Sequence, residues 1–172
     1  ITPRFEFTFS ANSFGFRPDK NARQAVGQAL AYIHQGQNYI VDIDLKTFFD
    51  EVDHCLLLNL IYQKVTCKTT MRLIRKWLKV LIKINGKLQK RHKGVPQGSP
   101  LSPLLSNILL HELDKKMMAM KLKFVRYADD FSIYCKSHNQ AKSTKVVVEK
   151  FLKNKLKLTI NQEKSGVRKP VN

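Results

Sequence analysis

The sequence contains no apolar run that approaches the length of a membrane span, and it does not open with a signal-peptide pattern. We therefore expect no membrane partner. It also lacks internal repeats, low-complexity tracts and flexible linkers that would divide it into domains. With 172 residues, 43% of them hydrophobic, it is long enough to bury most of its apolar surface in one core. We predict a single domain, and the start at Ile1 predicts a piece of a longer protein.

Cysteine and histidine are few and dispersed. The cysteines, Cys55, Cys67 and Cys135, are odd in number and have no metal-ligand spacing. The five histidines are equally scattered. These patterns argue against a zinc site, and they predict reduced, half-buried thiols of a cytosolic protein.

Acidic residues are scarce, since 13 Asp and Glu stand against 31 Lys and Arg and leave a formal net charge of +18. An excess this large, spread along the chain, predicts a polyanionic partner, with nucleic acid ahead of an anionic membrane. A solvated basic surface is the alternative. The few acids are grouped, however, at Asp42, Asp44 and Asp50 and at the adjacent pair Asp129 and Asp130. That grouping favours nucleic acid.

The adjacent acids lie inside residues 124–135, FVRYADDFSIYC. Two short apolar, β-favouring runs flank them, which predicts a β-hairpin whose turn carries two carboxylates. Because Asp is a common turn residue, a solvated turn without function is the alternative for this stretch alone.

A second acid-bearing strand is predicted at residues 38–45, NYIVDIDL. Its alternation places Asp42 and Asp44 on the same face, together with Ile40. Two carboxylates on so apolar a strand are costly unless they are solvated, paired or bound to a cation. Carboxylate oxygens suit Mg²⁺, which is typically held by one or two carboxylates plus substrate phosphates. Beside the hairpin, this strand would let three carboxylates converge on two divalent ions, as in nucleotidyl transfer.

Helical periodicity predicts the elements around these strands. Asp19 is the expected N-cap of a helix that runs to Gly36, and further helices are expected at 53–64, 69–83 and 139–155. An Asn-Gly step predicts a basic hairpin at 84–93. Residues 94–103, GVPQGSPLSP, predict a rigid loop that opens a helix to about residue 116.

Four segments in this order resemble the motifs of a known family. YADD, the strand with its following FFD, and PQGSPLSPLLSN look like the palm motifs of reverse transcriptases. Together with SFGFRPDKNARQAV, they most closely resemble the proteins encoded by group II introns. The resemblance covers nearly the whole chain, and it implies an α+β fold in which a palm-type antiparallel sheet packs on helices. Partial fingers would occupy about 1–36 and 69–93, the palm the remainder, and the thumb and maturase region would lie beyond the chain.

The resemblance also implies a function and its cofactor. The parent protein would be an RNA-directed DNA polymerase that extends a DNA primer with dNTPs on intron RNA, using two Mg²⁺ ions for which Mn²⁺ can substitute. Asp44, Asp129 and Asp130 would hold the metals. Asp44 is chosen over Asp42 by the family's spacing to the aromatic pair, and Asp42 would have a structural or electrostatic role.

Further residues would contact the nucleotide. Phe48 or Phe49, with Phe49 favoured, would lie under its sugar and select against a 2′-hydroxyl. Gln97 and Gly98 would line the template–nucleotide pair. The other two expected contacts are Arg17, near the nucleotide site, and Lys164, which would protonate or contact pyrophosphate. For Arg17 the residues alone leave open an equal alternative, a loop arginine that binds backbone carbonyls.

Several alternatives stay open at this point. One is an RNA-binding splicing maturase whose polymerase site is unused. Another is a related reverse transcriptase of a retron, diversity-generating or CRISPR-associated system, and a third is a basic RNA-binding domain without enzymology. A homodimer is a further option, and the expected location is the bacterial cytoplasm, close to the nucleoid.

Overall fold

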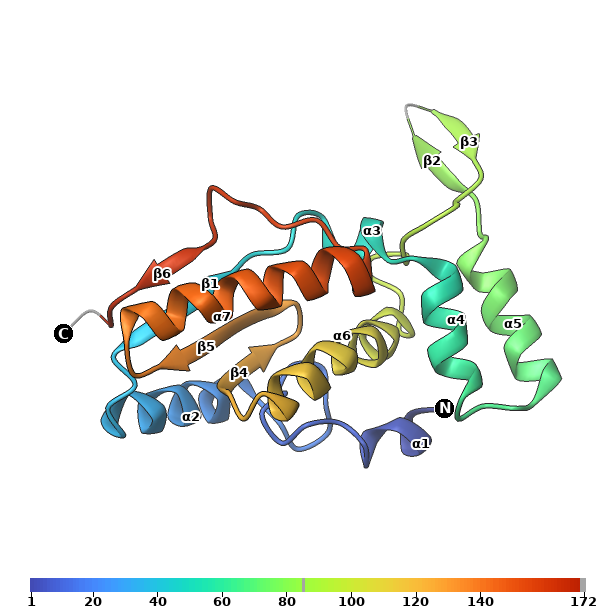
Figure 1. Ribbon diagram of the computed structural model, residues 1–172. Coiled ribbons are helices and arrows are strands. Elements are labelled where there is room, and N and C mark those ends of the chain that lie inside the picture. Colours follow the sequence, from blue (N-terminus) through green and yellow to red (C-terminus); the bar gives the residue numbers. More distant parts are fainter. Residues whose placement is uncertain (85, 171–172) are drawn as a thin grey trace.

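A four-stranded antiparallel sheet with strand order β4-β5-β1-β6 lies at the centre of the computed structural model, which describes residues 1–84 and 86–170 (Figure 1). A separate two-stranded sheet pairs β2 with β3. Both predicted hairpins are thus confirmed, except that Asp130 is the first residue of β5 and only Asp129 of the two acids lies in the turn. Asn85 of the predicted Asn-Gly turn lies outside the described residues. The strands are β1 (Tyr39–Ile43), β2 (Ile82–Ile84), β3 (Lys87–Gln89), β4 (Lys123–Tyr127), β5 (Asp130–Cys135) and β6 (Gly166–Arg168).

The helices surround the central sheet and extend beyond one end of it (Figure 1). They are α1 (Thr2–Glu6), α2 (Ala22–His34), α3 (Phe48–Glu51), α4 (His54–Tyr62), α5 (Lys68–Leu78), α6 (Ser102–Ala119) and α7 (His138–Phe151), which continues as a π-helical turn, η1 (Leu152–Leu156). The short helices α1 and α3 were not predicted. The predicted helix 69–83 was too long, because residues 82–84 pair with β3 as a strand. The α+β prediction is confirmed.

Helix α2 begins later than its sequence suggested. Its N-cap is Asn21, whose side chain accepts a hydrogen bond from the Gln24 amide (2.9 Å), while the Gln24 side chain accepts one from the Asn21 amide (2.9 Å). This reciprocal capping box satisfies two free backbone donors at the helix start. Asp19, the predicted N-cap, instead lies in the preceding turn with a left-handed φ of 57°.

The two faces of the sheet have different neighbours. On one face, Val41, Ile43, Phe124 and Ile133 are buried in the main core, which also holds residues of α6 and α7. On the other face, α2 covers only one end, where Val125 and other apolar side chains form a second, smaller cluster. Because alternate residues of a strand face opposite sides, Asp42 falls on this second face, beyond the smaller cluster.

Of the two parts predicted as fingers, 69–93 projects from this core, whereas helix α2 in 1–36 packs on the sheet (Figure 1). Helices α4 and α5 lie beyond one end of the sheet, and β2–β3 extends away from it (Figure 1). The division into palm and fingers remains a prediction. No helix within residues 1–84 and 86–170 is both long and apolar enough to cross a membrane. The cysteines are free, but Cys55 and Cys67 are exposed and Cys135 is buried, so the half-buried placement was wrong.

Candidate active site

The two acid-bearing segments lie side by side in the central sheet. β1 pairs with β5 in a register that sets Ile43 opposite Phe131, so Asp44 and Asp130 occupy corresponding ends of neighbouring strands. A hollow of about 230 Å³ opens beside them. Its lining brings together Asp42, Ile43, Asp44, Asp130, Phe131, Ser132, Lys164 and Arg168. The sheet thus assembles carboxylates that are more than 80 residues apart in the sequence.

The charges of these carboxylates are close enough to act on one another. Burial raises the pKa of Asp130 above its ordinary value, and the negative charges of Asp129 and Asp44 raise it further. A like charge nearby disfavours ionisation of a carboxyl group. The raised pKa of Asp130 therefore reflects its burial first and the two neighbouring negative charges second, and a bound cation would relieve the effect of those charges.

Asp42 has a different environment from its neighbour on the same strand. It accepts a hydrogen bond from the Ser132 hydroxyl (2.6 Å). Burial and the charge of Asp42 raise the pKa of Tyr134 to about 12. Asp42 is therefore held within the sheet, in agreement with the structural and electrostatic role predicted for it.

The residues of the hollow match the ligand chemistry of Mg²⁺ only in part. Asp44, Asp129 and Asp130 offer the oxygen atoms that a hard cation prefers. In the described part of the chain, however, no three His, Cys, Asp or Glu side chains form a group that could hold a metal ion. Mg²⁺ usually takes one or two carboxylates and completes its shell with waters and substrate phosphates. The acid pair fits that incomplete shell.

The aromatic pair follows β1 directly. Thr47 adopts a left-handed conformation with a φ of 45°, and α3 then starts at Phe48. Phe48 is 2% exposed and belongs to the core, whereas Phe49 is half-buried and packs edge-on against it. Of the two candidates, Phe49 has the surface with which to contact a ligand.

The glycine-rich loop is fastened to the backbone of this aromatic segment. The Val95 amide donates to the Phe49 carbonyl, and the Gly94 amide donates to the Val52 carbonyl, both at 2.7 Å. His54 Nε2 donates to the Gly94 carbonyl (2.6 Å). A Cβ at Gly94 would lie 2.8 Å from the Asp50 carbonyl, so the close approach requires glycine. The exposed Gln97 and Gly98 follow immediately after this anchored segment.

Lys164 is brought to the acids by the segment that precedes β6. The Asp44 amide donates to the Ser165 hydroxyl (3.0 Å), and the Asn161 amide donates to the Asp44 carbonyl (2.9 Å). Arg168, which also lines the hollow, was not predicted. A strand as short as β6 shows too little alternation to reveal which of its residues face the site.

Arg17 is engaged elsewhere. Its guanidinium forms an ion pair with Glu6 (2.8 Å) and donates to the carbonyls of Ser10 (2.5 Å) and Ser13 (2.8 Å). The side chain is 8% exposed. The structure thus shows the carbonyl-binding alternative, and a contact between Arg17 and a phosphate would require these bonds to break.

A buried polar cluster beneath the acid turn was not predicted either. Arg126 is fully buried and forms a two-pronged ion pair with Asp114 of α6, at 2.8 and 2.6 Å. It also donates a hydrogen bond to the Asn107 side chain (2.9 Å). The sequence offers no local signal for this pairing, because an arginine in a strand gives no indication of a partner on a helix.

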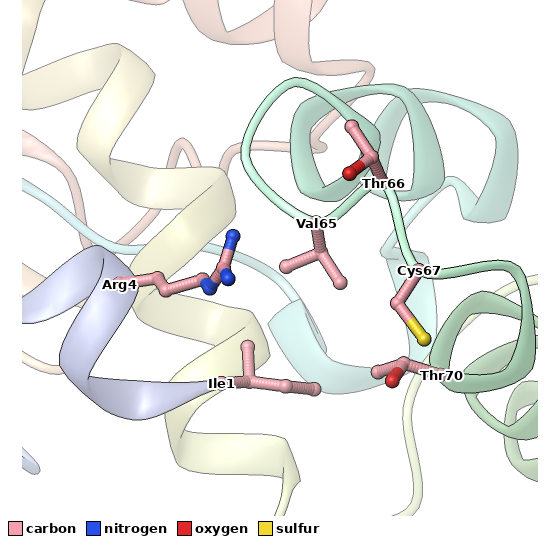
Figure 2. Close-up of a pocket in the computed structure, with 6 residues that line it drawn as sticks. All are labelled: Ile1, Arg4, Val65, Thr66, Cys67 and Thr70. Atoms are coloured by element: carbon pink, nitrogen blue, oxygen red, sulfur yellow. The ribbon is translucent and has the colours of Figure 1, made fainter.

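A second hollow, of about 280 Å³, lies between α1 and the connection from α4 to α5. Figure 2 shows Ile1 and Val65 pointing into it, with Arg4 on one side and Cys67 and Thr70 on the other. Hydrogen bonding by the Thr70 side chain lowers the pKa of Cys67. The lining of this hollow contains no carboxylate, which argues against a metal site there.

Residues 2–171 match a protein family described as reverse transcriptase (RNA-dependent DNA polymerase). The chain is 37% identical over 140 residues to the group II intron-encoded protein LtrA of Lactococcus lactis subsp. cremoris, covering 80% of this chain and 23% of LtrA. It is 29% identical over 219 residues to the putative COX1/OXI3 intron 2 protein of Saccharomyces cerevisiae, covering 94% of this chain and 26% of that protein. It therefore spans about a quarter of the length of these relatives.

Among solved structures, apo telomerase from Candida tropicalis superposes with a TM-score of 0.71 at 14% identity. The superposition covers 96% of this chain and 34% of the telomerase chain. At this identity the likeness concerns the fold alone. It confirms the predicted palm-type arrangement of an antiparallel sheet on helices.

Proposed function

Because this chain belongs to the reverse transcriptase (RNA-dependent DNA polymerase) family, we propose that it carries the catalytic palm of an RNA-directed DNA polymerase of the group II intron type. The observation that carries the proposal is the placement of Asp44 and Asp130 at corresponding ends of neighbouring strands, where both line one hollow. The intron-encoded relatives support the intron type. The bacterial relative supports a bacterial cytoplasmic location.

Asp44 and Asp130, with Asp129 from the turn, are the residues that would hold Mg²⁺, or Mn²⁺ in its place. When bound, a pair of such ions activates the attacking 3′-hydroxyl and neutralises charge on the leaving pyrophosphate. The protein's contribution is placement, because β1 and the β4–β5 hairpin fix the acids on neighbouring strands. Lys164 would place a positive charge beside the pyrophosphate from the rim of the same hollow.

The nucleotide would be held by the segments next to the acids. Phe49, rather than the buried Phe48, would contact its sugar and exclude a 2′-hydroxyl by steric conflict. Gln97 and Gly98 would line the base pair, since their loop is bonded to the backbone of Phe49. A dNTP, an RNA template and a DNA primer are therefore the proposed substrates.

The basic surface supports nucleic acid as the partner. Helix α5 buries Met71, Ile74 and Leu78 and turns Arg72, Arg75, Lys76 and Lys79 to solvent. Cations arranged in this way neutralise phosphates and release counterions, which makes binding steeply dependent on salt. Splicing-type RNA binding is the second candidate function, because this basic face is present independently of the acid hollow.

Primer extension on an RNA template, with Mg²⁺ and dNTPs, tests the proposal. The full-length protein should extend the primer, and its Asp130→Asn variant should not, while both bind RNA equally well. If neither protein extends the primer but both bind intron RNA tightly, the polymerase proposal fails and RNA binding alone remains. If the variant extends the primer as well as the parent, Asp130 has no part in the chemistry.

A further inference from the structure

The turn between β4 and β5 has an unusual backbone. Ala128, directly before the two acids, has a left-handed φ of 57°, which residues other than glycine and asparagine rarely adopt. Such a conformation persists only where its surroundings enforce it. The carbonyl of Ala128 accepts a hydrogen bond from Arg126 Nη1 (2.8 Å). The direction in which Asp129 and Asp130 leave the turn therefore depends on a contact made from below the sheet.

Arg126 itself is held without freedom to move. Its Nε and Nη2 atoms donate to the two oxygens of Asp114, and Nη1 is shared between the Asn107 side chain (2.9 Å) and Ala128. Burial alone would raise the pKa of Asp114, but the neighbouring Arg126 charge holds it below its usual range. A planar guanidinium bound along two edges fixes direction as well as distance.

The N-terminal loop closes on the same turn. A Cβ on Gly15 would lie 2.2 Å from the Ala128 amide nitrogen, so only glycine permits the observed contact. Asn107 donates to the Gly15 carbonyl (3.0 Å) and accepts from Arg126. The backbone of Arg126 is bonded to the loop on both its amide and its carbonyl, to Asn12 (2.9 Å) and Phe14 (2.8 Å). Helix α6 and this loop thus grip one hairpin turn.

We propose that Arg126, with Asp114 and Asn107, is a positioning unit that sets Asp129 and Asp130 opposite Asp44. This inference rests on the proposed function, since it assumes that these acids hold a divalent cation. Arg126 is fully buried and faces α6, on the side of the sheet away from the acids, so it acts through the turn and not on the substrate. The alternative is that the buried pair serves only the stability of the fold.

The two roles are separated by a variant that keeps the volume of the pair but removes its polar contacts. Replacement of a buried ion pair by apolar residues of similar size is often neutral for stability. The double change Asp114→Leu with Arg126→Met removes the bond to the Ala128 carbonyl in this way. Lys123→Met is the matched control, since Lys123 donates to Gln35 (2.5 Å) at the opposite end of the same strand from the turn.

The measurement is the dissociation constant of Mn²⁺ in the full-length protein, from the free-ion electron paramagnetic resonance signal without substrate. Loss of groups that orient metal ligands typically costs about 10–100-fold in metal affinity or activity. We expect a loss of that size for the double variant, a matching fall in kcat, an unchanged KM for dNTP and no effect of Lys123→Met. Circular dichroism melts verify that the variants are folded.

Gly15→Ala provides a second test that leaves the ion pair intact. Its Cβ would clash with the backbone of Ala128, so Mn²⁺ affinity should fall here as well. Asp130→Asn is the reference for the acids. If Asp130→Asn weakens Mn²⁺ binding but the folded double variant and Gly15→Ala do not, the positioning role is overturned and the proposed function stands. If Asp130→Asn leaves Mn²⁺ binding unchanged, both are overturned.

Discussion

Carboxylates on the two opposite faces of the β4–β5 hairpin have different surroundings. Below the hairpin, Asp114 is fully buried and paired with Arg126, which keeps its pKa low. Above it, burial and the neighbouring charges of Asp129 and Asp44 raise the pKa of Asp130. Arg126 balances the charge of Asp114, whereas Asp130 lies beside the like charges of Asp129 and Asp44. In the proposed function, a cation from outside the protein would bind to the acids above the hairpin.

The largest effect is expected below the hairpin. Arg126→Met alone would leave Asp114 buried without its partner, and breaking a buried pair in this way costs about 3–5 kcal/mol. The free energy of unfolding, measured by urea denaturation, should fall by that amount. Asp130→Asn, the matched change above the hairpin, should cause no such loss. Equal stability of Arg126→Met and the parent protein would show that the buried pair is not what balances Asp114.

The next effect concerns the polymerase activity that depends on the acids above the hairpin, Asp44, Asp129 and Asp130. Asp44→Asn should slow primer extension by about 10²–10³-fold, because a metal ion supplies several kcal/mol of charge stabilisation. The unfolding midpoint should stay the same. Asp42→Asn is the control from the same strand and face, and it should retain most of the activity since Asp42 is bonded to Ser132. Equal losses in the two variants would contradict the distinction between these acids.

Asp42 is intermediate between Asp114 and Asp130, because its carboxylate accepts a hydrogen bond from a hydroxyl group and is not paired with a cation. Ser132→Ala removes the donor of its 2.6 Å hydrogen bond. A hydrogen bond to a charged group contributes about 1.5–3 kcal/mol when buried, and we expect roughly 1 kcal/mol at this half-buried site. Thermal melts would measure the loss. Ser132→Thr keeps the hydroxyl and should restore much of the stability, whereas a neutral Ser132→Ala would place Asp42 with the solvated acids.

The smallest effect is the pH dependence of stability. The lowered pKa of Asp114 means that its contribution is complete above 3.8, the ordinary carboxyl value, and is lost as pH falls through the lowered pKa. Asp130 has the opposite sign, because its raised pKa makes stability fall as pH rises from 3.8 through the raised value. Asp130→Asn should therefore gain stability at pH 7, by less than about 1 kcal/mol at so exposed a site. A loss of stability at pH 7 would contradict the sign.

The acids above the hairpin could be predicted from the sequence because the signals that place them are local. Asp129 and Asp130 are adjacent, and Asp44 follows an alternating strand, so short-range periodicity places each of them correctly. Phe49 was slightly favoured over Phe48 within the family resemblance, and the burial of Phe48 agrees with that choice. The predicted assignment of these residues to metal and nucleotide stays a prediction.

The buried pair of Arg126 and Asp114 below the hairpin could not be predicted, since it depends on tertiary contacts. Arg126 occupies a strand position that alternation assigns to the core, yet only the approach of α6 supplies Asp114 and makes a charge tolerable there. The same limit applies to Arg17, whose partner Glu6 is on a helix too short to predict.

The N-cap of α2 was misplaced for a local reason. Asp19 and Asn21 are both good capping residues, and the reciprocal hydrogen bonds between Asn21 and Gln24 decide between them.

The most direct test of the central claim is the affinity for Mn²⁺ of the full-length protein and of two single variants, Asp44→Asn and Asp42→Asn. Both changes remove one negative charge from the same face of the same strand, so a general electrostatic effect would weaken binding equally. Our account predicts that Asp44→Asn weakens Mn²⁺ binding by about 10-fold or more while Asp42→Asn leaves it nearly unchanged. Equal affinities in the two variants would contradict the claim that Asp44 is a ligand and Asp42 a structural neighbour.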